Sequence, residues 1–167
     1  SDGNRVAIGS PYIDGDGKEK NGWLRVFDYN SESKSWTQIG RNIYGEASGD
    51  SSGYSASMSS DGNRVAIGAP NNDDGGSSSG HVRVYELNSG DWRQIGNDID
   101  GEDAYDIFGA SLSMSSDGNK LAIGSPYNDG NGPVNFASGR LSIYEWTKSE
   151  STWTQIGYLI GEVYANA

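Results

Sequence analysis

Cysteine is absent from this chain of 167 residues, and histidine occurs once, as His81. The lack of cysteine excludes disulfides and thiolate metal sites. A Ser-His-Asp triad would need this lone imidazole beside an activated serine. The other two copies of the repeat described below carry Trp23 and Arg140 at the equivalent position. We therefore predict that His81 is a surface residue at the start of a strand, and that the chain is not an enzyme.

Basic charge and long apolar runs are also scarce. Lysine and arginine number 12 against 23 aspartates and glutamates, which gives a net charge of -11. Such an acidic chain is poorly suited to binding nucleic-acid phosphates. No apolar stretch approaches the ~18 residues that a membrane-spanning helix needs. We expect neither a nucleic-acid partner nor a membrane span.

An internal repeat dominates what is present. The opening stretch SDGNRVAIG returns at residue 60 and, as SDGNKLAIG, at residue 116, and a second block of the form W-x-Q-I-G begins at Trp36, Trp92 and Trp153. Self-similarity over ~50 residues is typical of repeat architectures. We assign 1–59 to a first repeat that lacks its first strand. The second repeat, 60–115, takes its first strand from 51–59, and the truncated third, 116–167, takes its own from 107–115.

Each repeat shows the local signals of four strands. In the second repeat these strands lie around Ser55 to Met58, Val65 to Ile67, Val82 to Leu87 and Trp92 to Ile95. The Asp-Gly-Asn between the first two tolerates the positive φ of a tight hairpin turn. A proline follows the second strand in every copy and ends it, because proline has no amide hydrogen to donate. These prolines are Pro11, Pro70 and Pro126.

Four short antiparallel strands per ~50 residues are typical of a propeller blade. Val82 and Val84 lie on one face of their strand, and Tyr85 and Leu87 lie on the other. A sheet with one solvated face would alternate apolar and polar residues, so both faces of this one are expected to be covered. We predict an all-β fold of propeller-type, four-stranded antiparallel blades, in three tandem repeats that form an incomplete ring on their own.

The strand-entry sequences resemble a known family. Phe108-Gly109-Ala110-Ser111, followed by Leu121-Ala122-Ile123-Gly124-Ser125-Pro126, is similar to the FG-GAP repeat of integrin alpha-chain propellers. The resemblance implies a seven-bladed propeller used in extracellular recognition, located outside the cell or at its surface. We therefore expect a non-catalytic structural or adhesion module that binds proteins or self-assembles through blade faces and edges. The alternative is a carbohydrate-binding propeller lectin.

Calcium is the cofactor to consider for such a family. The FG-GAP units that bind it carry an Asp-x-Asp-x-Asp-Gly loop, which this chain replaces with Ser-Ser-Asp-Gly-Asn, so those sites do not transfer. A different set of oxygen ligands, suited to calcium, lies between the second and third strands of each repeat. These candidate metal ligands are Asp14, Asp16, Asp73, Asp74, Asp129 and Asn131. The favoured alternative is a solvated turn built from the residues that turns need.

Acidic residues also recur between the fourth strand of one repeat and the first strand of the next. Glu46 and Asp50 align with Glu102 and Asp106. We favour a structural role for them, in which the carboxylates cap backbone amides.

The aromatic residues divide into two groups. Trp36, Trp92 and Trp153 recur at one position of every repeat, which suits packing between blades. A second group differs between copies and falls in or near loops, so we predict that it forms a ligand-binding surface. Its members are Tyr12, Trp23, Tyr44, Tyr127 and Trp146.

The expected partners follow from the need to close the ring. Propellers close with roughly 4 to 8 blades, so three repeats leave apolar blade faces and a strand edge exposed. We expect the chain to associate with copies of itself or with further repeats of a longer chain, and to take an extracellular protein or glycan as ligand. A neighbouring strand would pair beside Val6-Ala7-Ile8.

Overall fold

The computed structural model describes residues 3–129 and 138–161, and these ranges hold strands, turns and loops but no helix. The strands are β1 (Arg5–Ser10), β2 (Trp23–Asn30), β3 (Ser35–Tyr44), β4 (Ser55–Met58), β5 (Arg64–Ala69), β6 (His81–Asn88), β7 (Asp91–Gln94), β8 (Ile99–Asp100), β9 (Ser111–Met114), β10 (Lys120–Ser125), β11 (Arg140–Thr147) and β12 (Thr152–Ile160). Within the described ranges, no helix is long and apolar enough to cross a membrane.

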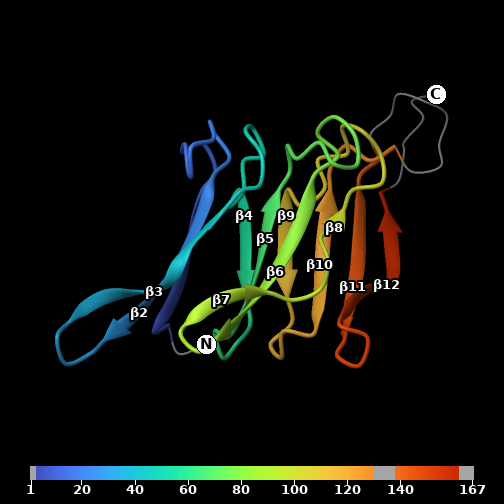
Figure 1. Cartoon of the computed structure of the whole chain (residues 1–167). Helices are drawn as coiled ribbons and strands as arrows, with labels where there is room; N and C mark the ends of the chain where they lie inside the picture. The colour runs from blue at the N-terminus through green and yellow to red at the C-terminus, as the bar shows by residue number, and fades with distance from the viewer. Residues whose placement is uncertain (1–2, 130–137, 162–167) are drawn as a thin grey trace.

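The strands form three antiparallel sheets that stand side by side along the chain (Figure 1). Blade 1 has the order β1-β2-β3, blade 2 has β4-β5-β6-β7 with β8 also paired to β6, and blade 3 has β12-β11-β10-β9. The outer strand is continuous in blades 1 and 3 but divided into β7 and β8 in blade 2. The predicted all-β fold of propeller-type blades in an incomplete ring is confirmed.

The repeated Asp-Gly-Asn is a hairpin turn held by its own aspartate. In blade 3, Asp117 Oδ1 accepts hydrogen bonds from Ser115 Oγ at 2.6 Å and from the amide of Asn119 at 3.0 Å. Gly118 sits at φ 71°, a region that glycine adopts without steric cost. These hydrogen bonds stabilise the ionised carboxylate, and they lower the pKa of Asp117 to about 2.

We expect Ser115→Ala to raise the pKa of Asp117 towards the ordinary aspartate range, because the serine hydroxyl is its largest stabilising contact. A folded-state pKa below the unfolded value means that the turn stabilises the fold above the unfolded pKa. This contribution is lost as pH falls through the folded pKa near 2. A carboxyl-carbon NMR titration measures the shift, with Ser116→Ala as the neighbouring control. An unchanged Asp117 titration in Ser115→Ala would contradict this account of the turn.

The arginine after the first and the second turn reaches the next blade. Arg5 of blade 1 pairs with Asp28 at 2.6 Å and donates to the carbonyl of Gly62 in the blade 2 turn at 2.9 Å. Arg64 repeats this one blade further on, where it donates to the carbonyl of Gly118 at 3.2 Å. The SDGNR motif therefore forms a turn and also joins that turn to its neighbour.

Two apolar layers lie between the blades. Val82, Val84 and Leu121 belong to the layer between blades 2 and 3, and Tyr85 and Trp92 belong to the layer between blades 1 and 2. Burial on both faces of β6 confirms the prediction that this strand is sandwiched. The layers also fix which side chains of β6 face blade 1.

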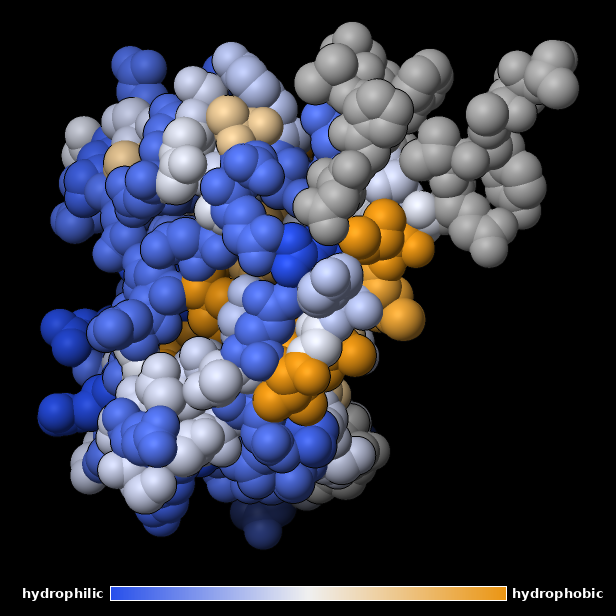
Figure 2. All heavy atoms as spheres, turned by 90° about the vertical axis from the view of Figure 1, so that its right-hand side faces the viewer, coloured by the Kyte–Doolittle hydropathy of each residue, from blue (hydrophilic) through white to orange (hydrophobic). Residues whose placement is uncertain are grey.

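The open face of blade 3 is partly apolar. Figure 2 shows orange residues gathered on the side that β12 presents. The exposed large hydrophobic residues of this strand are Ile156, Tyr158, Leu159 and Ile160. Trp36 of blade 1 is also exposed, so the prediction that it packs between blades is wrong, whereas Trp92 and Trp153 are buried.

Candidate functional site

The only histidine of the chain lies buried where blades 1 and 2 meet. His81 is the first residue of β6 and pairs with Ala69 of β5 on one side and Asp100 of β8 on the other. Its exposed fraction is 0%, so the prediction of a surface residue is wrong. The sequence places it at a strand start, but the flanking strands and the loops of blade 1 cover it.

Alternation along β6 decides what His81 faces. Val82 and Val84 point towards blade 3, so His81, Arg83 and Tyr85 point towards blade 1. Arg83 donates to the carbonyl oxygen of Tyr44 at 2.8 Å, and its Nη1 lies 3.2 Å from Glu46 Oε1. A nearly buried guanidinium thus bridges blade 2 to the end of blade 1.

Four carboxylates gather around this imidazole. Asp98 Oδ2 lies 3.6 Å from His81 Nδ1. His81, Asp98 and Asp100 form one group whose ligand atoms all lie within 4.8 Å of one another, and Glu46, Asp74 and His81 form a second. We call these residues and Arg83 the junction cluster. Either acidic group could hold a metal ion, which agrees with the coarser part of the sequence prediction.

Burial and crowding of like charge perturb the titration of the junction cluster. Burial lowers the pKa of His81, and the Arg83 charge acts in the same direction. Burial raises the pKa of Glu46 and of Asp100, and the neighbouring Asp98 charge raises both further. The cluster therefore combines one imidazole and one Arg–Glu pair with three further carboxyl groups.

Differences between the first and second repeats could have indicated this site from the sequence. Asn42 and Tyr44 of β3 are the counterparts of Asp98 and Asp100, and Trp23 is the counterpart of His81. The second repeat therefore departs from the first at several positions, and strand pairing brings those positions together. Sequence comparison within the chain shows the departures. The strand register that makes them neighbours becomes visible only in the sheet.

Two of the predicted metal ligands accept hydrogen bonds from backbone amides of their own loops. Asp14 accepts a hydrogen bond from the amide of Lys20, and Asp73 accepts one from the amide of Ser78. Asp129 is exposed, and Asn131 lies outside the described residues. Of the five that the structure describes, Asp74 is the one that enters an acidic group able to hold an ion. Asp50 likewise caps the amides of Glu46 and Ala47, as predicted for the linker.

The predicted aromatic ligand residues are dispersed over the molecule. Tyr12 and Tyr127 are exposed on loops, Trp23 packs under Arg25, and Trp146 packs against Trp153. Tyr44 alone lies near the junction cluster.

A cavity of about 390 Å³ lies next to the junction cluster, between blades 1 and 2, and is lined in part by Asp16, Tyr44, Tyr85 and Trp92. This cavity brings together Asp16, a predicted metal ligand, and Tyr44, a predicted aromatic ligand-binding residue. Since Tyr44 also accepts the Arg83 hydrogen bond, this cavity and the cluster share a wall.

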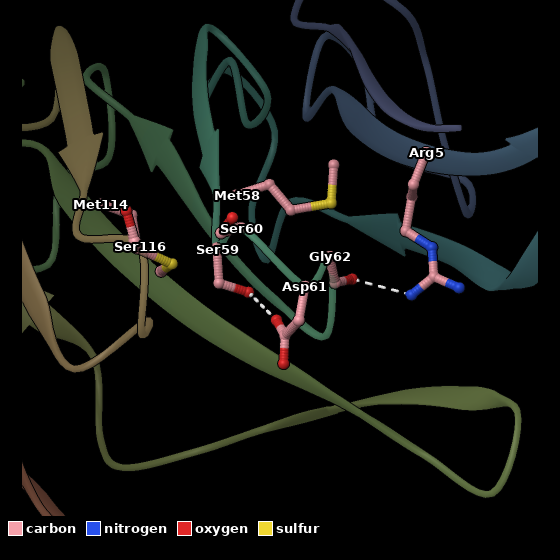
Figure 3. A pocket seen from close by; sticks show the side chains of 8 residues that line it. All are labelled: Arg5, Met58, Ser59, Ser60, Asp61, Gly62, Met114 and Ser116. Carbon is pink, nitrogen blue, oxygen red and sulfur yellow. Dashed lines mark hydrogen bonds between the residues drawn. The ribbon is translucent and has the colours of Figure 1, made fainter. Parts of the chain in front are cut away.

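A second cavity, of about 250 Å³, lies at the opposite end of the blades (Figure 3). Met58 and Met114 contribute to its lining. Several of its polar groups are engaged with one another, since Ser59 Oγ donates to Asp61 and Arg5 donates to the carbonyl of Gly62. The junction cluster is therefore the stronger candidate site.

Comparison with known proteins places the fold. No protein-family model matches the chain, and no curated protein matches its sequence. The structure is similar to that of a proposed 6-phosphogluconolactonase from Bacteroides uniformis, with a TM-score of 0.55, 14% identity, and coverage of 93% of this chain and 38% of the other. A periplasmic gluconolactonase from Pseudomonas aeruginosa has a TM-score of 0.49 at 14% identity, with 93% and 38% coverage. The tricorn protease has a TM-score of 0.47 at 11% identity, with 91% and 12% coverage.

These comparisons correct several predictions. The chain spans 38% of the length of the Bacteroides protein, and at this identity the likeness concerns the fold. Identification with FG-GAP integrin repeats is wrong, because no family model matches and the similar propeller is of a lactonase type. The same similarity, to a protein described as a 6-phosphogluconolactonase, overturns three predictions. These are the non-catalytic adhesion module, the lectin alternative and the statement that the chain is not an enzyme. This similarity also overturns the predicted protein or glycan ligand. Location outside the cell or at its surface stays a prediction.

Proposed function

We propose that this chain supplies three blades of a propeller hydrolase that opens a small lactone, with the junction cluster as its reactive centre. The observation that carries the proposal is the convergence of a buried imidazole, a buried guanidinium and four carboxylates at one blade junction. The lactonase description of a protein with a similar fold supplies the substrate class.

The exposed rim of the junction cluster suits the chemistry of ester hydrolysis. Glu46 and Asp74 are exposed, so a bound substrate can reach them. One of these carboxylates accepts a proton as a water oxygen attacks the lactone carbonyl carbon. The carbonyl oxygen becomes negatively charged, and the guanidinium of Arg83 is the adjacent positive group. Cleavage of the ring C–O bond then returns the proton to the alkoxide, and the product is a hydroxy acid.

The charge of the site favours a neutral lactone. Three carboxylates of the cluster remain after Glu46 pairs with Arg83. A phosphorylated lactone would bring further negative charge towards them, and like charges at close range cost several kcal/mol. Calcium, which is the less favoured interpretation of these acidic loops from the sequence, is kept in this proposal as one candidate ion for the exposed carboxylates of Glu46 and Asp74.

We expect the chain to accelerate ring opening of glucono-δ-lactone, and we expect the double variant Glu46→Gln/Asp74→Asn to lower kcat/KM by about 10²-fold or more. Proton release followed in a weakly buffered solution measures the rate above the spontaneous reaction. Glu102→Gln is the matched control, because Glu102 is the counterpart of Glu46 and pairs with Arg140 at the next blade junction.

The proposal fails if the chain gives only the spontaneous rate with neutral and phosphorylated lactones alike. It also fails if the double variant, folded as judged by circular dichroism, retains the activity of the parent chain. A preference for the phosphorylated lactone would contradict the charge argument while leaving the reaction class intact.

A further inference from the structure

The buried imidazole of His81 lacks the contacts that such a group normally has. Neither ring nitrogen has a hydrogen-bond partner among the described residues, although the side chain is fully covered. Buried polar groups are almost always hydrogen-bonded, since an unsatisfied one costs roughly 1–3 kcal/mol. The position of His81 therefore needs a further occupant.

The groups nearest to the ring cannot satisfy both of its nitrogens. An ionised carboxylate only accepts hydrogen bonds, and a neutral imidazole has one donor and one acceptor nitrogen. Asp98 Oδ2, at 3.6 Å from Nδ1, is too distant for a hydrogen bond. The acceptor nitrogen consequently needs a hydrogen-bond donor or a Lewis-acidic partner.

The spacing of the donor atoms fits a metal ion. Nitrogen and oxygen ligands each bind Zn²⁺ at roughly 2.1 Å, and two ligands in tetrahedral geometry are then about 3.4 Å apart. The distance of 3.6 Å between His81 Nδ1 and Asp98 Oδ2 is close to this value. Asp100 offers a third ligand atom within 4.8 Å of both, and pairing of β6 with β8 sets Asp100 directly opposite His81.

Charge and ligand type narrow the choice of ion. Arg83 opposes a cation, but Glu46 compensates its charge at 3.2 Å. Asp74, Asp98 and Asp100 remain as uncompensated carboxylates facing the imidazole. A site of one imidazole and two carboxylates suits Zn²⁺ better than calcium, which takes oxygen ligands alone.

We propose that His81, Asp98 and Asp100 bind one zinc-class divalent metal ion, with a fourth coordination position open towards the exposed rim of the junction cluster. This metal site goes beyond the proposed function. It can be tested separately, because binding of the ion can be measured without turnover. An ion so placed would sit beside Glu46 and Asp74, where it would polarise a lactone carbonyl or a bound water.

Calorimetric titration of the chelator-treated chain with ZnCl₂ tests the inference. We expect one equivalent to bind, and we expect Asp98→Asn and Asp100→Asn each to weaken binding at least tenfold. Co²⁺ should give the visible absorption of a tetrahedral site, and His81→Asn should abolish it. Asp129→Asn, an exposed aspartate of another loop, should leave both signals unchanged. Because Asp100 is exposed, its variant keeps the test valid even if His81→Asn does not fold.

Three results would overturn the inference: no Zn²⁺ binding, Zn²⁺ binding that survives both aspartate variants, or a calcium affinity equal to that for Zn²⁺ and independent of His81. Failure of the proposed function is distinguishable from these. Zinc binding at the triad without lactone hydrolysis would refute the function alone. Lactone hydrolysis at the same rate with and without added ZnCl₂, together with no zinc binding in the titration, would refute the metal site alone.

Discussion

Gly68→Ala is expected to destabilise the chain by about 3 kcal/mol or more, because a methyl group at this position has no space. A Cβ built on Gly68 of β5 overlaps the carbonyl oxygen of Gly109 in blade 3. That oxygen also accepts a hydrogen bond of 2.6 Å from Ser55 Oγ, so any shift that relieves the overlap disturbs this bond as well. The backbone of Gly68 is not at positive φ, so the effect is one of space between blades.

Gly124→Ala is the matched control for this effect. Gly124 is the counterpart of Gly68 in blade 3, but the nearest atom to its added Cβ is the hydroxyl of Ser111, a side chain that can rotate away. Urea denaturation followed by circular dichroism should give a loss below about 1 kcal/mol for Gly124→Ala. Equal losses in the two variants would show that blade-to-blade contact is not what requires glycine at position 68.

Trp92→Ala is expected to cost about 3–5 kcal/mol, whereas the same change at Trp36 should cost less than about 1 kcal/mol. Trp92 is 7% exposed, and its Nε1 donates to the carbonyl of Ile39 in blade 1 at 3.1 Å. Its ring also lies against Gly40, where a Cβ would come within 2.8 Å of Cδ1. Trp36 has the same local sequence but is 47% exposed.

Urea unfolding of the two alanine variants measures this difference. Trp92→Phe separates its sources, because it keeps most of the buried ring and removes the hydrogen bond. We expect this variant to lose about 1–2 kcal/mol. If Trp36→Ala and Trp92→Ala were equally destabilising, the tryptophan of the repeat would act within its own blade and not between blades.

Local sequence patterns were sufficient for most strands and turns, although not for β8. The predicted run from Val65 to Ile67 lies within β5, which ends at Ala69 directly before Pro70. These features depend on neighbours along the chain: alternation of side chains, the permissive φ of glycine, and the missing amide of proline. The family resemblance was wrong because glycine, alanine and proline, which carried it, meet the same local demands in any propeller.

The sequence by itself determined the blades and their number in this chain. Only the tertiary structure decided that His81 is buried, that Asp98 and Asp100 face it, and that Glu46 and Asp74 approach it from two different loops. The physical reason is that strand pairing and blade stacking join residues far apart in sequence. The residue type at one position does not determine which residue it will face on the neighbouring strand.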